Sequence, residues 1–78
     1  MEITLDRLPV GRQAVLSSLR LQGSIRRRLL ELGFTEGTTI CCLRRAALDS
    51  PILYQLRGTQ IALRKQDAQQ IVMVIPCG

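Results

Sequence analysis

Several short stretches of the chain are alternating, β-branched or continuously apolar, patterns that are typical of β-strands. The predicted strands are short and separated by turn residues: RQAVLSSLRL (12–21), TTICCLRR (38–45), ILYQL (52–56), QIALR (60–64) and IVMVI (71–75). Gly58 and Thr59 are predicted to join ILYQL to QIALR through a tight turn, so that these two strands form a hairpin. Ahead of the first strand, Leu5, Leu8 and Val10 are predicted to hold an N-terminal segment against the core.

One stretch between the first two strands has the period of a helix instead. Ile25, Leu29 and Leu32 recur at i, i+4 and i+7, which predicts a helix whose core-facing side they form. Ser24 is the predicted N-cap, because its hydroxyl can accept from the free amides of the first turn. Gly33 is predicted to end the helix in the left-handed conformation.

A second helical segment is predicted over KQDAQQ (65–70), as a single turn with Ala68 facing inward. Together these elements predict a mainly β fold: an SH3-like five-stranded antiparallel barrel with one inserted helix and a late single helical turn. The 78 residues suffice for one domain and are too few for two, so we expect one SH3-like domain over residues 1–78.

Arginine dominates the charge of the chain, which has eleven Lys and Arg, six Asp and Glu and a formal net charge of +5. Guanidinium groups bind carboxylates and phosphates, so the composition indicates either an acidic protein surface or a nucleic acid as partner. A basic surface for nucleic acid would use Arg26, Arg27, Arg44, Arg45, Arg57 and Arg64. One Tyr and one Phe offer few platforms for base stacking, which argues against that partner.

Residues for catalysis and metal binding are scarce. The chain has no His and its carboxylates are scattered, so we predict no catalytic residue and no enzyme. Adjacent Cys41 and Cys42 point to opposite faces of a strand, so at most one of them could join Cys77 in a metal site. A thiol activated by Arg44 or Arg45 is a further alternative. We expect no cofactor, and weak transition-metal binding through these thiols stays open as the alternative.

The expected location is the cytoplasm. No apolar run approaches the roughly 18 to 20 residues needed to cross a bilayer, and MEITLDRLPV lacks the pattern of a signal peptide. We therefore expect no insertion into a membrane. The cysteines are expected to remain thiols in a reducing compartment.

The helix carries three arginines, residues 26–28, in its opening turn, where negative charge is favoured. A solvated helix face is the simpler interpretation, because Glu31 could pair with an arginine one turn earlier. That interpretation accounts neither for the arginines at this end nor for Leu30, which lies outside the core stripe. Residues that contradict both the charge preference of a helix end and the apolar pattern of a helix often mark a functional surface. The hypothesis is a partner-binding face formed by Arg26, Arg27, Leu30 and Phe34.

Three segments follow one another in an order that resembles the ferrous iron transport protein A (FeoA) family: RRLLELGFTEGTTI (27–40), AALDSP (46–51) and RGTQIALRKQDAQQIVMV (57–74). The loop departs from the family pattern at Ala47, where Pro is usual. The matching positions are mainly scaffold: Leu29, Leu32, Gly33, Gly37, Pro51, Gly58, Ile61, Leu63, Arg64, Ala68, Ile71 and Val74.

The resemblance implies an SH3-like barrel with an inserted helix and no catalysis. It also implies an accessory or regulatory role in ferrous iron uptake, through contact with the cytoplasmic GTPase part of a FeoB-like membrane transporter. Two other functions stay open from the residues alone: a transition-metal-binding module that uses Cys thiols, and a basic nucleic-acid-binding SH3-like module. The oligomeric state and the direction of regulation are also left open.

Overall fold

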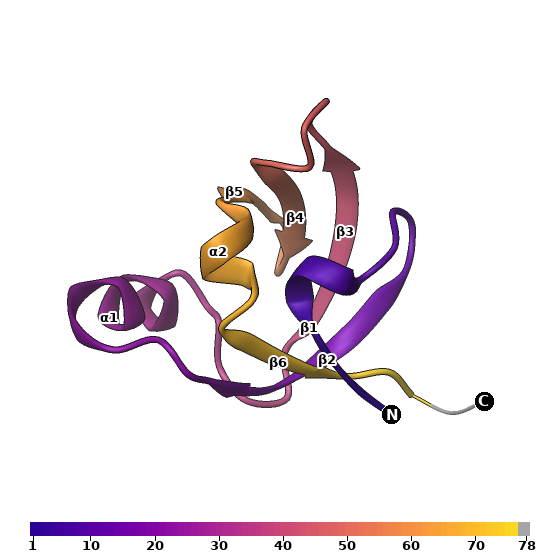
Figure 1. Ribbon diagram of the computed structural model, residues 1–78. Helices are drawn as coiled ribbons and strands as arrows, with labels where there is room; N and C mark the ends of the chain where they lie inside the picture. Colours follow the sequence, from indigo (N-terminus) through magenta and orange to yellow (C-terminus); the bar gives the residue numbers. More distant parts are fainter. Residues whose placement is uncertain (77–78) are drawn as a thin grey trace.

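Six antiparallel strands form one strongly curved sheet (Figure 1). The structure is a computed structural model that describes residues 1–76. The elements follow one another as β1 (Glu2–Thr4), the 3-10 helix η1 (Leu5–Arg7), β2 (Gln13–Leu19), α1 (Gly23–Glu31), β3 (Thr39–Arg45), β4 (Ile52–Leu56), β5 (Thr59–Leu63), α2 (Lys65–Ala68) and β6 (Ile71–Val74). In the sheet their order is β1-β6-β2-β3-β4-β5. The mainly β prediction, with an inserted helix and a late helical turn, is confirmed.

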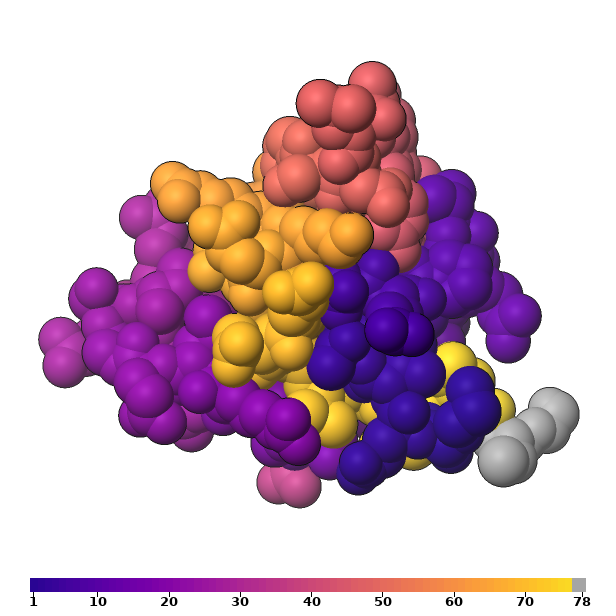
Figure 2. Space-filling view, viewed as in Figure 1, coloured from indigo at the N-terminus to yellow at the C-terminus, as the bar shows by residue number. Residues whose placement is uncertain are grey.

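The predicted strand count of five is wrong, because the described residues also contain β1. Its register on β6 runs from Glu2↔Val74 to Thr4↔Val72. Figure 2 shows the indigo N-terminal residues against the yellow residues of the last strand, as this pairing requires. A three-residue strand is too short to show a period of two, so its partner far along the chain decides its conformation.

The core is aliphatic and gathers residues from every strand except β1, which contributes only the half-buried Ile3. On β4, Ile52, Tyr54 and Leu56 are buried as predicted. The Tyr54 hydroxyl donates to the Leu5 carbonyl at 3.1 Å, which satisfies the one polar atom of that ring. Burial raises the pKa of Tyr54 well above its ordinary range.

Segments outside the strands show two further differences from the predictions. Leu5 and Leu8 are buried as predicted, but Val10 is 56% exposed because it stands in the turn before β2. The β4–β5 turn is made by Arg57 and Gly58, with φ values of 50° and 77°, and not by Gly58 with the residue after it. Two successive left-handed residues match the twist of a two-residue hairpin.

Arg45 ties the β3–β4 loop to η1. Its Nη2 donates to the carbonyls of Asp6 and of Leu8, the latter at 3.0 Å. Its Nη1 lies 3.7 Å from an Asp49 carboxylate oxygen. Arg45 therefore serves the fold and is not available to a basic surface. No helix within residues 1–76 has the length and apolar character needed to cross a bilayer.

Candidate docking site between helix α1 and strand β2

Helix α1 stands to one side of the sheet, beside the end of β2 (Figure 1). It begins at Gly23, and Gln22 at the N-cap makes no side-chain hydrogen bond, so the prediction of a Ser24 cap is wrong. Its first turn has no acidic residue. Gly33 follows the helix with φ 108°, which confirms the predicted left-handed stop.

The core-facing side of α1 differs from the predicted stripe at one position. Leu29 is 1% exposed and Ile25 packs against the core, as predicted. Leu32 is 38% exposed, because the chain turns at Gly33 and carries Phe34 into the core instead. The Phe34 amide donates to the Leu29 carbonyl at 2.9 Å, which holds the aromatic ring under the helix.

A cleft of about 200 Å³ separates α1 from β2. We call it the α1–β2 cleft. It is lined by Leu16, Ser17, Ser18, Leu19, Arg26, Leu30, Phe34 and Glu36. Three of the four residues predicted to bind a partner therefore lie around one hollow.

The cleft exists because β3 begins opposite the middle of β2. The last residue pair between these strands is Val15↔Thr39. Leu16 then exchanges main-chain hydrogen bonds with the turn before β3, at 2.8 and 2.9 Å. Beyond this point β2 continues through residues 17–19, paired with β6 alone among the described strands. The other edge of this part of β2 faces the cleft.

Arg26 is the basic residue of the cleft lining among residues 1–76. Its Nη1 donates to the Leu19 carbonyl at 2.7 Å. Within residues 1–76 the one ion pair joins Arg45 and Asp49, so no carboxylate there neutralises Arg26, and the proposed pairing of Glu31 with the helix arginines is not observed. Arg26 therefore presents a charged group that keeps unused donors.

The four predicted partner-binding residues differ in what they can offer. Leu30 is 39% exposed within the cleft, and Arg27 is exposed beside it. Phe34 has no exposed surface, so it must be corrected from a contact residue to the buried wall behind the cleft. Sequence reasoning missed the β2 edge at residues 17–19, because only the register of β3 shows that this edge lacks a strand.

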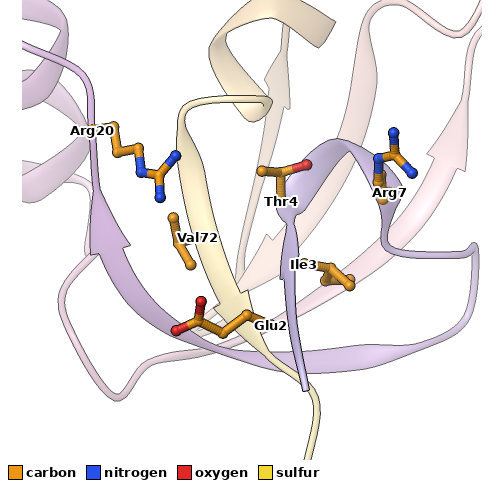
Figure 3. Close-up of a pocket in the computed structure, with 6 residues that line it drawn as sticks. All are labelled: Glu2, Ile3, Thr4, Arg7, Arg20 and Val72. Atoms are coloured by element: carbon orange, nitrogen blue, oxygen red, sulfur yellow. The ribbon is translucent and has the colours of Figure 1, made fainter.

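A second hollow, of about 370 Å³, lies over β1 and β6 and contains none of the predicted residues. Figure 3 shows Arg20 reaching toward β6, with Glu2 on the same side of β1 and Arg7 beyond Thr4. The two guanidinium groups share the hollow with a carboxylate, so its charge is mixed. The described residues that line it include no pair of groups suited to acid–base or nucleophilic catalysis.

Cys41 and Cys42, the cysteines within residues 1–76, do not come together in a site. Cys42 is fully buried and Cys41 is half-buried on the opposite face, as the strand pattern predicts. Burial raises the pKa of the Cys42 thiol, and nearby Arg45 offsets this only in part, so the alternative of an activated Cys42 is wrong. Cys77 lies outside the described residues. Within residues 1–76 no three His, Cys, Asp or Glu side chains are grouped to hold a metal ion.

Known proteins resemble this chain over most of its length. Residues 3–74 match the family model of the FeoA domain. The Fe(2+) transport protein A/Fe(2+) transporter FeoB fusion protein of Porphyromonas gingivalis is 37% identical over 67 residues. That match covers 86% of this chain and 8% of the relative, so the chain corresponds to a small part of that protein.

Two solved structures share the fold. The FeoA protein of Chlorobium tepidum has a TM-score of 0.91 and 32% identity, over 97% of this chain and 72% of that one. The Stenotrophomonas maltophilia FeoA, solved with zinc and described as an SH3 domain protein, has a TM-score of 0.82 and 33% identity, over 91% and 88% of the two chains. These structures confirm the predicted SH3-like fold. The bound zinc is a property of the Stenotrophomonas structure.

Proposed function

The chain belongs to the FeoA family, and on that premise we propose that it docks onto the cytoplasmic GTPase part of a ferrous iron transporter through the α1–β2 cleft. The family is linked to ferrous iron transport and is not a known enzyme family. In this role the chain acts in the cytoplasm as one SH3-like domain, without a cofactor. It works by binding and not by catalysis.

The observation that carries this proposal is the meeting of Leu30 and Arg26 in one cleft. Leu30 is 39% exposed and shares the cleft lining with the apolar Leu16 and Phe34. Arg26 adds at the same place a guanidinium that no carboxylate within residues 1–76 pairs with. A partly exposed apolar side chain rimmed by forked cations is the composition of a binding hot spot.

The fusion protein of Porphyromonas gingivalis supports the choice of partner. There a FeoA-like segment and FeoB are by name parts of one polypeptide. Joining two modules raises their effective concentration toward each other, which benefits pairs that work in contact. For the present chain we propose association with a transporter of the same kind.

The test is calorimetric titration of the chain with the purified cytoplasmic domains of the ferrous iron transporter encoded in the same genome. Burying the exposed part of Leu30 is worth about 0.6–1.2 kcal/mol, so Leu30→Ala should weaken binding about threefold to eightfold. Leu32→Ala is the matched control, because Leu32 is 38% exposed on the same helix end and does not line the cleft. It should bind like the wild type.

The double substitution of Arg26 and Arg27 by Ala should also weaken binding and reduce its salt dependence, because both cations face the partner. If neither variant changes the affinity, the cleft is not the site. If the wild-type chain does not bind the transporter domains at all, the proposed function itself is refuted.

A further inference from the structure

The unpaired edge of β2 indicates how a partner enters the cleft. We propose that the α1–β2 cleft binds an extended, acidic segment of the partner, which adds as a strand to β2 at Leu19. One carboxylate of that segment replaces the Leu19 carbonyl as the hydrogen-bond acceptor of Arg26. The inference rests on the proposed function, because it names the binding mode of the same cleft. It commits to a strand and not to a helix.

The main chain of Leu19 faces the cleft. Ser18 pairs with Val72 of β6, and the Arg20 amide donates to the Gln70 carbonyl at 2.7 Å, so the groups of both residues are directed to β6. In an antiparallel strand, successive residues direct their N–H and C=O groups to opposite edges. Leu19 therefore directs both groups away from β6, and its carbonyl is indeed the one that Arg26 reaches.

This edge has the form that strand addition uses. Within residues 1–76, β2 has no strand neighbour on the cleft side of Leu19. An extended chain placed there can accept from the Leu19 amide and donate to its carbonyl, as in other complexes formed at sheet edges. A cleft of about 200 Å³ does not admit a helix, which is about 10 Å across, whereas an extended chain can lie along the edge.

Arg26 couples strand addition to the charge of the partner. At present its guanidinium donates to a neutral carbonyl. A carboxylate is the stronger acceptor, because charge-assisted hydrogen bonds are roughly twice as strong as neutral ones. When Arg26 turns to a carboxylate, the Leu19 carbonyl needs a new donor, and the backbone N–H of the added strand supplies it. A neutral or basic segment has no carboxylate to replace the Leu19 carbonyl as the acceptor of Arg26.

The charges around the cleft also favour an acidic segment. Arginines 26–28 are cationic, the free N–H groups at the start of α1 add a partial positive charge, and the first turn of α1 has no acidic residue to offset them. Among residues 1–76, Glu36 is the only acidic residue that lines the cleft. An acidic side chain is therefore favoured beside Arg26 and disfavoured beside Glu36, and an apolar side chain of the same segment can cover Leu30.

The experiment titrates the full ¹⁵N-labelled chain with a six-residue capped peptide in which glutamate and valine alternate. We expect amide shifts at residues 16–19 and at Leu30, together with slower hydrogen exchange at the Leu19 amide. Two further peptides test strand pairing directly. Each is methylated on the backbone nitrogens of alternate residues, so that one peptide loses the N–H groups of one strand edge and the other loses those of the opposite edge. The pattern that blocks the paired edge should weaken binding about tenfold, and a lysine–valine peptide should not bind.

Two variants separate the coupling from general attraction. Arg26→Gln should weaken binding of the glutamate peptide about fivefold or more. Arg28→Gln is the matched control, because it removes the same charge from an exposed position that does not line the cleft, and it should change binding less than about twofold.

The inference is overturned if the peptide leaves the cleft amides unshifted, or if both methylated peptides bind as well as the parent. It is also overturned if the transporter domains bind without slowing exchange at the Leu19 amide, and in that case the proposed function stands. If the peptide produces the expected signature while the transporter domains do not bind, strand addition stands and the proposed function fails.

Discussion

Replacing each of the two adjacent leucines of α1 by alanine should separate the stability of the fold from the cleft. Leu29 is 1% exposed, so Leu29→Ala removes core contacts and leaves a cavity, at a cost of about 2–5 kcal/mol. Leu30 is 39% exposed, and its side chain opens to solvent. Burying a whole leucine side chain contributes about 1.5–3 kcal/mol to stability, and about three fifths of the Leu30 side chain is buried. Alanine keeps part of this contribution, so Leu30→Ala should lower the free energy of unfolding by about 1 kcal/mol.

Thermal unfolding followed by circular dichroism measures this difference. One kcal/mol corresponds to roughly 4–8 °C in Tm for a domain of this size, so Leu29→Ala should lower Tm by at least about 8 °C. Leu30→Ala should lower it by about 4–8 °C and leave the native spectrum unchanged. Equal losses for the two variants would show that Leu30 belongs to the core, and the reasoning that makes it a binding residue would be wrong.

Two further substitutions test groups that hold the fold. Arg45→Gln should lower the free energy of unfolding in urea by about 1.5–3 kcal/mol, because the charged hydrogen bonds to the carbonyls of Asp6 and Leu8 are lost, and wild-type stability would show that this contact contributes nothing. Tyr54 has a raised pKa, so above about pH 10 the unfolded tyrosine ionises while the buried one keeps its proton, and stability should fall as pH rises. Tyr54→Phe should cost about 0.5–1.5 kcal/mol at neutral pH and flatten that alkaline fall, and an equally steep fall in the variant would contradict the assignment to Tyr54.

Most of the fold follows from local patterns in the sequence. Alternation over ILYQL places Tyr54 in the core, and the position of Gly33 predicts the end of α1. The errors occur where distant contacts decide. The helical periodicity predicts that Leu32 faces the core, but the chain reverses direction at Gly33. This reversal leaves Leu32 exposed and buries Phe34. Leu32 is thus exposed where the stripe predicts burial, and Phe34 is buried where the partner-binding hypothesis places a contact residue.

The candidate site could be predicted only in part. Arg26 and Leu30 are four residues apart on one helix, so their shared face follows from helical geometry. The opposite wall depends on where β3 begins beside β2, and that register is set by pairs such as Val15↔Thr39 across the α1 insertion. No local pattern contains that register, so the free edge at Leu19 becomes visible only in the folded chain.

The most direct measurement of the central claim is hydrogen–deuterium exchange of the whole chain, with and without the cytoplasmic domains of the transporter. The account predicts slower exchange on binding at residues 16–19 and along α1, on both walls of the cleft, with the β4–β5 hairpin unchanged. Protection confined to that hairpin, or to the hollow over β1 and β6, with the cleft exchanging as in the free chain, would contradict it.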